Sequence, residues 1–342
     1  MQKNFLISHK FEKKFIEIIK REKLFSNNDF LIVGFSGGAD SVALLYLLNK
    51  IYKKTNEILA IHINHNLRKN SLIDEKFAIS FAKKNDIDFE VFDVDIKKLA
   101  IEKKNSIEKI AREFRYEVFY STANKHKSEN SNIKIFTAHH KNDQVETILL
   151  RLIRGTGIQG LSGIKCKSVF RKEFELVRPM LNFSKDEILE YLAAEKIEFV
   201  SDESNFENEY KRNKIRNKLI PYLEKNYNEN IKEAIYRYAK SANIANDFLD
   251  KETAKIFERL VHGKNTNKKV EVHYQKIKNL DREILIRFIV KVFNTIGLKQ
   301  DIEMTHIEAG LKMIEKKEGN KVIQFPHGYE MSLANKKICF YK

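Results

Sequence analysis

Hydrophobic and polar positions along the first 140 residues predict strands that alternate with helices. Strand-like apolar runs occur at Phe30–Phe35, Glu57–Ile63, Phe89–Val94 and Ile133–Thr137. Short apolar runs of this kind are typical of parallel strands that are covered on both faces. The segments between them carry apolar residues at helical spacing, most clearly in Ser106–Lys125. This alternation predicts an α/β fold, a doubly wound parallel sheet of Rossmann-like type that binds ligands at the carboxyl ends of its strands.

The pattern beyond the fourth strand predicts two more helices and a hairpin. One helix begins near residue 142, carries an apolar stripe and ends at Gly155. The segment from Lys165 to Arg178 alternates in a way that favours a β-hairpin. Ser184 and Glu187 have the spacing of a capping box, so a helix is expected to begin there.

The character of the chain changes beyond Pro221. Long, lysine-rich helical patterns cover 228–262, 280–296 and 302–317, and the strand-like pieces VIQF, YEMSL and KICFY follow. We therefore predict two domains. Residues 1–220 form the α/β domain, and residues 221–342 form a smaller, mostly helical basic domain with a short β tail at 321–342.

Composition and charge narrow the class of partner. The 342 residues include 63 Lys and Arg against 47 Asp and Glu, a net charge of +16 that favours a polyanion such as nucleic acid. Cys166 and Cys339 are the two cysteines and form no CxxC pair, which excludes a disulfide framework, a zinc ribbon and a cysteine-held iron–sulfur cluster. No stretch has the length of a membrane span or the pattern of a signal peptide, so we expect a cytoplasmic protein.

A glycine-rich loop directly follows the first strand and has the sequence Ser36-Gly37-Gly38-Ala39-Asp40-Ser41. Its glycines permit a tight turn, and the amino end of the next helix is a natural site for phosphate. Asp40 and Ser41 can cap that helix or reach a metal-bound phosphate. The loop lacks the Gly-Lys-Ser/Thr of Walker A and does not match GxGxxG. A simple connecting turn would explain a lone SGG, but the complete hexad between strand and helix favours nucleotide binding.

A second constellation follows the fourth strand, in HHKNDQVET. Asp143 and Glu146 are three residues apart and share one helix face, where two carboxylates can bind a metal ion or an amine. Helix capping by Asp143 is the structural alternative, and the two roles are compatible. His139 and His140 leave the strand end and can relay protons or stabilise phosphate. Zinc is a weaker interpretation, because the spacing is not that of HExxH.

Two arginine pairs complete the candidate chemistry. Arg112 and Arg115 lie on adjacent parts of a predicted helix, and Arg212 and Arg216 are spaced i, i+4 on one face. Each pair has the donors to meet phosphates or carboxylates. A solvated helix surface explains either pair taken alone.

The motifs occur together in a familiar order. The loop resembles the SGGxDS signature of the PP-loop ATP pyrophosphatases, which cleave ATP between its α- and β-phosphates. The chain then continues with HINHNLR, AREFRY, TAHHKNDQVETILLRLIRGTG, RPML, DESN and RNKIRNKLIPYL. As an ordered set these motifs resemble the tRNA(Ile)-lysidine synthetase family, firmly over residues 30–225 and more weakly beyond.

The resemblance implies a two-step reaction on an isoleucine tRNA with a CAU anticodon. The wobble cytidine attacks the α-phosphate of ATP, and free L-lysine then displaces AMP to leave lysidine. In this sequence the loop would cradle the phosphates, with Asp40 near Mg²⁺. Lysine would be held by Asp143, Glu146 and Arg212, and adenylation would use Asp40, His139 and Arg112.

The chain departs from the family pattern at one position, because Asn142 stands where many relatives have Asp. We expect Asn142 to be tolerated and Asp143 to matter more. The basic domain is expected to bind tRNA, and a homodimer is compatible with the sequence. A tRNA thiolase is disfavoured by the unpaired cysteines, and GMP or NAD synthetases by the charge. A non-catalytic binding protein on the same fold is disfavoured by the complete loop and carboxylates.

Overall fold

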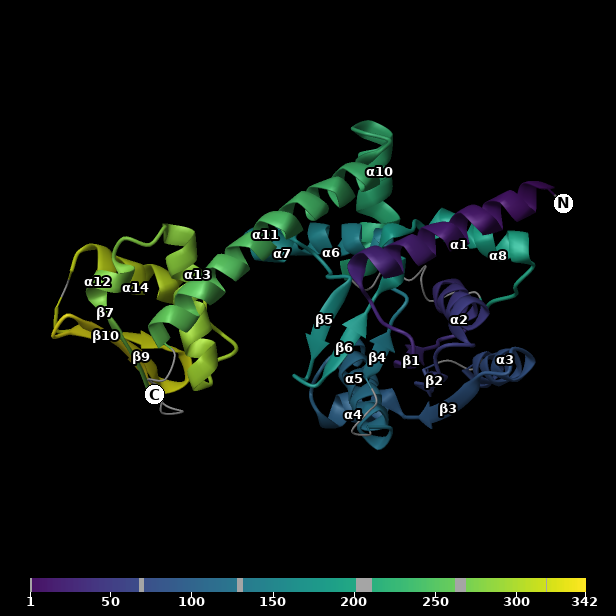
Figure 1. The fold of residues 1–342 in the computed structure, drawn as a ribbon, viewed down its shortest axis with the longest axis horizontal. Coiled ribbons are helices and arrows are strands. Elements are labelled where there is room, and N and C mark those ends of the chain that lie inside the picture. The colour runs from purple at the N-terminus through teal and green to yellow at the C-terminus, as the bar shows by residue number, and fades with distance from the viewer. Residues whose placement is uncertain (1, 68–70, 128–131, 201–210, 262–268, 318) are drawn as a thin grey trace. The chain divides into compact units, whose positions relative to one another are not determined.

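The computed structural model describes residues 2–67, 71–127, 132–200, 211–261, 269–317 and 319–342 (Figure 1). Contacts divide the chain into two compact units, Met1–Lys240 and Ser241–Lys342. Each unit has its own sheet and its own hydrophobic core. Within the described ranges, no helix combines the length and the apolar character that a membrane crossing requires.

The first unit is built on a six-stranded sheet. Its strand order is β3-β2-β1-β4-β6-β5, and every neighbouring pair is parallel except β5 with β6. The four predicted parallel strands and the predicted hairpin are therefore confirmed. The strands are β1 (Phe30–Gly34), β2 (Ile58–Asn64), β3 (Asp88–Asp93), β4 (Ile133–Phe136), β5 (Lys167–Phe170) and β6 (Phe174–Val177).

Helices cover both faces of this sheet, as a doubly wound fold requires (Figure 1). Leu31 and Val33 of β1 belong to one core with Phe15 and Ile188, whereas Ile32 belongs to another core with Phe119. The alternation follows from the two-residue period of a strand. The helices are α1 (Gln2–Glu22), α2 (Ala39–Tyr52), α3 (Ser71–Lys84), α4 (Ile96–Glu102), α5 (Ile107–Lys125), α6 (Lys141–Arg154), α7 (Ile158–Leu161), α8 (Lys185–Glu195), α9 (Lys211–Lys214) and α10 (Ile220–Asn226), with a π-helical turn at Ile215–Leu219.

The strand order places a switch point between β1 and β4. The chain leaves β1 toward β2 on one side, and β4 pairs with β1 on the other side. In open α/β sheets the crevice beyond the carboxyl ends at such a point is where ligands bind. Both the glycine-rich loop and the HHKND segment leave the sheet here.

The second unit has a four-stranded antiparallel sheet, packed with helices. Its strand order is β7-β10-β9-β8, with β7 (Lys269–His273), β8 (Lys321–Phe325), β9 (Tyr329–Ala334) and β10 (Lys337–Tyr341). The predicted helices are present as α11 (Ile231–Val261), α13 (Arg282–Ile296) and α14 (Met304–Glu315), and a short α12 (Tyr274–Ile277) lies between α11 and α13. The three predicted tail strands are confirmed, and β7 is a strand that the sequence analysis did not predict.

The division between the units falls later than the predicted residue 220. Ile215, Ile220 and Tyr236 join Val145 and Leu149 of α6 in one buried cluster. This packing attaches α10 and the start of α11 to the first unit, so contacts place the division after Lys240. The roles assigned to the two domains remain predictions.

A glycine next to the loop allows a close helix contact, and this leads to a stability prediction. A Cβ on Gly34 would lie 2.7 Å from the Phe119 ring, and that ring is buried at 1% exposure. We expect Gly34→Ala to lower the free energy of unfolding by about 1–3 kcal/mol through overpacking. Urea unfolding followed by circular dichroism measures this.

The matched control is Gly157→Ala, because a Cβ there meets nothing within 4 Å and the backbone φ is −81°. It should cost about 1 kcal/mol or less. The double variant Gly34→Ala with Phe119→Leu should lose less free energy of unfolding than the two single variants lose when their losses are added. Strictly additive single effects would contradict the proposed overlap.

Candidate active site

The glycine-rich loop is held in a closed turn by its own serines. Gly37 has a φ of +81°, which favours glycine, and its carbonyl accepts the Val200 N–H at 2.9 Å. The Ser41 hydroxyl accepts the Ser36 N–H at 3.2 Å and donates to the Gly38 carbonyl at 2.9 Å. The N-cap of α2 is Gly38, which makes no side-chain cap, so the predicted capping by Asp40 or Ser41 is not seen. The first-turn N–H groups of α2 are thereby left to an anion.

Asp40 lies in the first turn of α2 and meets two other helix starts. Its Oδ1 lies 2.7 Å from Lys185 Nζ, and its Oδ2 lies 3.6 Å from His140 Nε2. The side chain of Asp40 is 29% exposed, so the carboxylate remains accessible. Asp40 is thus the acidic group of the loop, flanked by cationic or hydrogen-bonding partners from α6 and α8.

The amino end of α6 is capped by His140 rather than by Asp143. His140 Nδ1 accepts the Asn142 N–H at 3.2 Å, and Asp143 Oδ2 accepts the His140 N–H at 2.9 Å, so the two form a reciprocal cap. Asn142, the position at which this chain differs from many relatives, has a structural role. Its Oδ1 accepts the Lys185 N–H at 3.3 Å. This hydrogen bond ties the first turn of α6 to the first turn of α8.

Glu146 is a nearly fully buried carboxylate with two arginine partners. It is 1% exposed, and it accepts Arg212 Nε at 2.6 Å and Arg216 Nε at 2.6 Å. Arg212 also donates to Asp143 Oδ1 at 2.7 Å. The predicted placement of both arginines on one face is therefore seen, and both reach the acidic face of α6. Asp143 and Glu146 also share one face of α6, as predicted, because Arg212 donates to both.

The electrostatic surroundings fix two charge states. Burial raises the pKa of Asp143, but the charges of His140 and Arg212 outweigh it and hold that pKa below its usual value. Burial lowers the pKa of His139 to about 3, and Arg178, Arg212 and Arg112 add to this effect against the attraction of Asp143. Asp143 is therefore ionised at neutral pH, and His139 is neutral.

The structure separates the predicted residues into two groups. Asp40, Asp143, Glu146 and Arg212 lie in one connected network through His140. His139 lies beside it, with Nδ1 at 2.9 Å from Thr137 Oγ1. Arg112 is exposed on α5 and donates to the Tyr116 hydroxyl at 3.1 Å, with its guanidinium 4.9 Å from that ring. Among the described hydrogen bonds, none joins Arg112 to this network. Its positive charge acts on the network by lowering the pKa of His139.

Sequence reasoning did not assign Lys185 to the site. A signal was available, since Lys185 is the first residue of α8, and a helix macrodipole favours acidic residues there. A cation at such a position is a local conflict of the kind that functional sites show.

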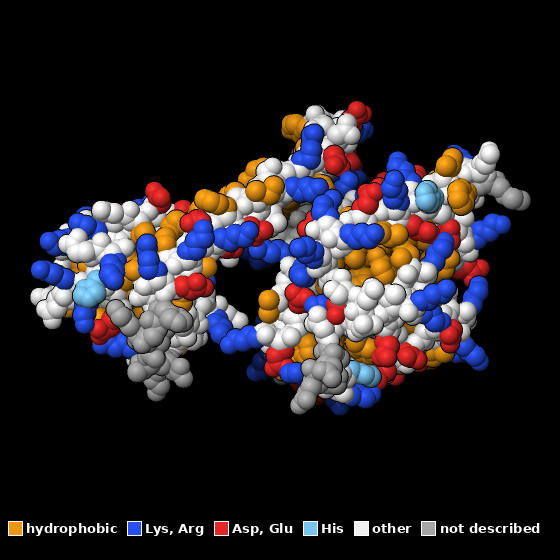
Figure 2. Space-filling view, viewed as in Figure 1, with side chains coloured by type: hydrophobic (Ala, Val, Ile, Leu, Met, Phe, Trp, Pro, Cys, Tyr) orange, Lys and Arg blue, Asp and Glu red, His pale blue; other side chains and the backbone are white. Residues whose placement is uncertain are grey.

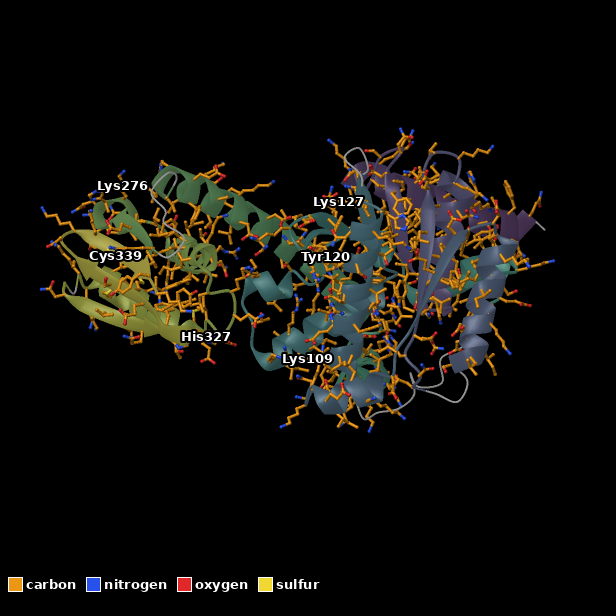
Figure 3. The ribbon with its side chains drawn as sticks, turned by 90° about the horizontal axis from the view of Figure 1, so that it is seen from below. Lys109, Tyr120, Lys127, Lys276, His327 and Cys339 are labelled. Atoms are coloured by element: carbon orange, nitrogen blue, oxygen red, sulfur yellow. The ribbon has the colours of Figure 1, made fainter. Side chains whose placement is uncertain are left out.

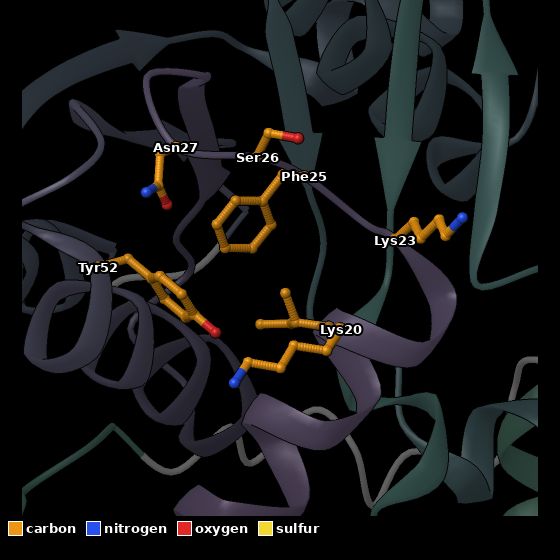
Figure 4. A pocket seen from close by; sticks show the side chains of 7 residues that line it. Lys20, Lys23, Phe25, Ser26, Asn27 and Tyr52 are labelled. Carbon is orange, nitrogen blue, oxygen red and sulfur yellow. The ribbon is translucent and has the colours of Figure 1, made fainter.

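A hollow elsewhere in this unit does not belong to the site. A pocket of about 300 Å³ is lined by residues that include Phe25, Asn27 and Tyr52. Figure 4 shows these side chains from close by. Phe25 and Asn27 precede β1 and so lie at the amino edge of the sheet, opposite the loop that follows β1. It holds none of the predicted site residues.

Comparisons with known proteins agree with this geometry. A model of the PP-loop domain family matches residues 7–223. The solved U34-tRNA thiolase NcsA from Methanococcus maripaludis superposes with a TM-score of 0.56 at 18% identity, covering 69% of this chain and 80% of that one, which shows the shared fold. These matches place the fold among the PP-loop domains.

Relatives with higher identity narrow the family. The tRNA(Ile)-lysidine synthase of Clostridium acetobutylicum is 36% identical over 327 residues, which cover 95% of this chain and 68% of that protein. That of Persephonella marina is 33% identical over 323 residues, covering 94% of this chain and 67% of that protein. The chain belongs to the tRNA(Ile)-lysidine synthase family of PP-loop proteins. It spans about two thirds of the length of these relatives.

The family's use of ATP raises the question of Mg²⁺. No group of three or more His, Cys, Asp and Glu able to hold a metal occurs in the part of the chain that is described. Mg²⁺ is commonly held by one or two carboxylates together with substrate phosphates, so such a cage is not needed. The accessible carboxylate of Asp40 beside the loop fits that mode.

The low pKa of His139 gives a testable pH dependence. The unfolded chain takes up a proton near pH 6.5, whereas folded His139 does so near pH 3. This contribution to stability is therefore complete above about pH 6.5 and is lost as the pH falls toward 3. We expect the His139 imidazole to show no titration between pH 8 and 5 in histidine side-chain NMR.

The signal is assigned by comparison with His139→Asn, which should also lose less stability on acidification across that window. A His139 midpoint above pH 6 would contradict the neutral state of this side chain.

Proposed function

We propose that this chain joins free L-lysine to the wobble cytidine of a CAU-anticodon isoleucine tRNA, at the expense of ATP. The observation that carries the proposal is the direct link between the glycine-rich loop and the acidic residues of α6. Asp40 of the loop and Asp143 each lie 3.6 Å from the same His140 nitrogen. An ATP phosphate and a cationic amino acid would thus be bound side by side at the β1–β4 switch point.

Adenylation is the first step. The cytidine oxygen bonds to the α-phosphorus of ATP, and the bond to pyrophosphate breaks. The loop Ser36–Ser41 would hold the phosphates through the N–H groups of α2, and Mg²⁺ on Asp40 would offset phosphate charge. Neutral His139 would take part by hydrogen bonding, since a pKa near 3 makes it a weak base. Arg112 would supply positive charge toward the α-phosphate.

Lysine attack is the second step. The lysine amine, after losing a proton, bonds to the ring carbon of the cytosine that carries the adenylated exocyclic oxygen, and AMP leaves with that oxygen. Asp143 and Glu146 would bind the amino acid's ammonium groups, and Arg212 its carboxylate. Arg212 uses Nε and one terminal nitrogen on the acidic pair. A guanidinium has five donors, so Arg212 retains donors for a substrate carboxylate.

The arginines define how lysine would enter. Arg216 donates to Glu146 and lies 3.8 Å from Asp143. An incoming ammonium would compete with Arg216 for these oxygens, because both are cations that seek the same acceptors. The acidic pair is thus kept neutralised until a substrate cation of suitable length takes over.

A sulfur-transfer function is not supported by the cysteines. Burial raises the pKa of Cys166 to about 12, and it also raises the pKa of Cys339. Thiols of this kind are poor nucleophiles at neutral pH. Cys339 lies on β10 of the second unit (Figure 3), and Cys166 lies in the first. The similarity to the thiolase is therefore one of fold.

The tRNA would be attracted by charge spread over both units. Residues 241–342 hold 19 Lys and Arg against 13 Asp and Glu. Figure 2 shows lysine and arginine side chains distributed over the visible face of each unit rather than in a single patch. Such a distribution suits contacts with a phosphate backbone, which are strong at low salt and carry no sequence information.

The function is tested with labelled lysine, Mg·ATP and isoleucine tRNA transcripts that carry a CAU or a GAU anticodon. We expect label only in the CAU transcript and only with ATP. Asp143→Asn should raise the KM for lysine at least about 10-fold, because it removes a charged hydrogen bond. The KM for ATP should stay within about twofold.

The control variant is Glu117→Gln, a carboxylate paired with Arg171 on the surface and 60% exposed, which should leave both KM values unchanged. If another tRNA supports pyrophosphate release and lysine is never incorporated, the lysidine proposal is wrong and only the PP-loop chemistry stands.

A further inference from the structure

The glycine-rich loop carries no positive charge of its own. Its only charged residue is Asp40, which adds a negative charge where phosphates are expected. Walker loops solve the same problem with a lysine inside the loop, which reaches the terminal phosphates of the nucleotide. A loop with the sequence SGGADS needs a cation from elsewhere in the chain to bind a triphosphate.

Lys185 reaches the loop from another helix. Its Nζ lies 2.7 Å from Asp40 Oδ1, although the two residues are 145 positions apart in sequence. The side chain is 34% exposed, so its ammonium is open to a ligand as well as to Asp40. The contact brings a cation to the first turn of α2, whose N–H groups face the predicted phosphates.

Two features of the chain fix this lysine in place. The Ser184 hydroxyl accepts the Glu187 N–H at 3.1 Å, and Glu187 accepts the Ser184 N–H at 2.7 Å, which sets the start of α8. The Lys185 N–H donates to Asn142 Oδ1 at 3.3 Å, which ties that start to α6. The backbone of Lys185 is therefore held from both sides, and its side chain extends to the loop.

The position is electrostatically costly without an anion. The positive end of the α8 dipole repels a lysine in the first turn, and the starts of α2 and α6 lie close by through Asp40 and His140. Asp40 is the carboxylate that Lys185 Nζ contacts, while Asp143 lies 3.6 Å from His140 and Glu187 caps the start of α8. A polyanion would complete the balance, and a triphosphate is the anion that the loop is expected to bind.

We propose that Lys185 binds the β- and γ-phosphates of ATP and then the pyrophosphate that leaves, with Asn142 as the residue that positions it. This inference rests on the proposed function in one respect, namely that the loop binds ATP. The ion pair with Asp40 keeps the ammonium beside the loop, and the phosphates take over part of its hydrogen bonding. The competing explanation is a structural ion pair that only neutralises Asp40.

The two explanations differ in which ligands Lys185→Met affects. Calorimetry without tRNA measures the Kd of a non-hydrolysable ATP analogue, of pyrophosphate and of AMP. We expect the ATP analogue and pyrophosphate to bind at least about 10-fold more weakly, because a charged hydrogen bond is lost. AMP has no β- or γ-phosphate, so its Kd should stay within about twofold. Lys185→Arg should retain most of the affinity for the ATP analogue.

The matched control is Lys14→Met. Lys14 lies on α1 and pairs with Glu187 of α8, the helix that Lys185 begins. The side chain of Lys14 is 35% exposed, against 34% for Lys185. It should leave all three Kd values unchanged. Asn142→Ala keeps the lysine but frees its backbone, and it should weaken the ATP analogue more than AMP.

The outcomes distinguish a failure of the proposed function from a failure of the role proposed for Lys185. Wild-type protein that binds neither ATP analogue nor pyrophosphate would overturn the proposed function and this inference together. Normal wild-type binding with unchanged values for Lys185→Met, or with equal losses for AMP and the ATP analogue, would overturn this inference alone. If Lys185→Met does not fold, Lys185→Arg and Asn142→Ala decide, and unaltered ATP affinity in Asn142→Ala would count against the positioning role.

Discussion

The candidate site depends on the ion pairs of the buried Glu146 carboxylate with Arg212 and Arg216. Removing a carboxylate from water costs several kcal/mol unless its oxygens are fully hydrogen-bonded to a cation. Arg212 and Arg216 meet that need, and they come from the segment that follows residue 210. The same contacts attach this segment to α6, where Ile215 and Ile220 add apolar packing. One charged cluster thus shapes the acidic face of α6 and positions the arginines beside it.

Three helix starts meet at the carboxyl edge of the sheet. Asp40 lies in the first turn of α2, His140 caps α6, and Lys185 begins α8. The Asp40 carboxylate lies 2.7 Å from Lys185 Nζ and 3.6 Å from His140 Nε2. Each helix start contributes partial positive charge, so the region suits anions. The acidic pair of α6 lies at its border and suits a cation. An enzyme that joins a cationic amino acid to a phosphate-activated base needs both environments in contact.

Local patterns in the sequence predict much of this fold, and long-range pairings are what they miss. The strands of the first unit, the hairpin and the Ser184–Glu187 capping box follow from periodicity and short-range chemistry, and the structure confirms them. Strand β7 was missed because KVEVH, although it alternates polar residues with valines, is only five residues long, and its partner β10 lies about 70 residues later. Lys185 was missed for the same reason. Arg212 entered the predicted site through family resemblance, since i, i+4 spacing alone equally describes a surface helix.

Binding of lysine by Asp143 and Glu146 of α6, which Arg212 and Arg216 hold in place, can be tested directly. Equilibrium dialysis of labelled L-lysine in the presence of an ATP analogue measures this directly on wild-type protein and on Glu146→Gln. Glu233→Gln is the control. Glu233 lies on α11, pairs with Lys141 of α6 and is 48% exposed. The account predicts saturable binding that norleucine, which lacks the side-chain amine, does not compete, and a loss of at least about 10-fold in Glu146→Gln alone. Equal competition by norleucine, or unchanged lysine binding in folded Glu146→Gln, would contradict it.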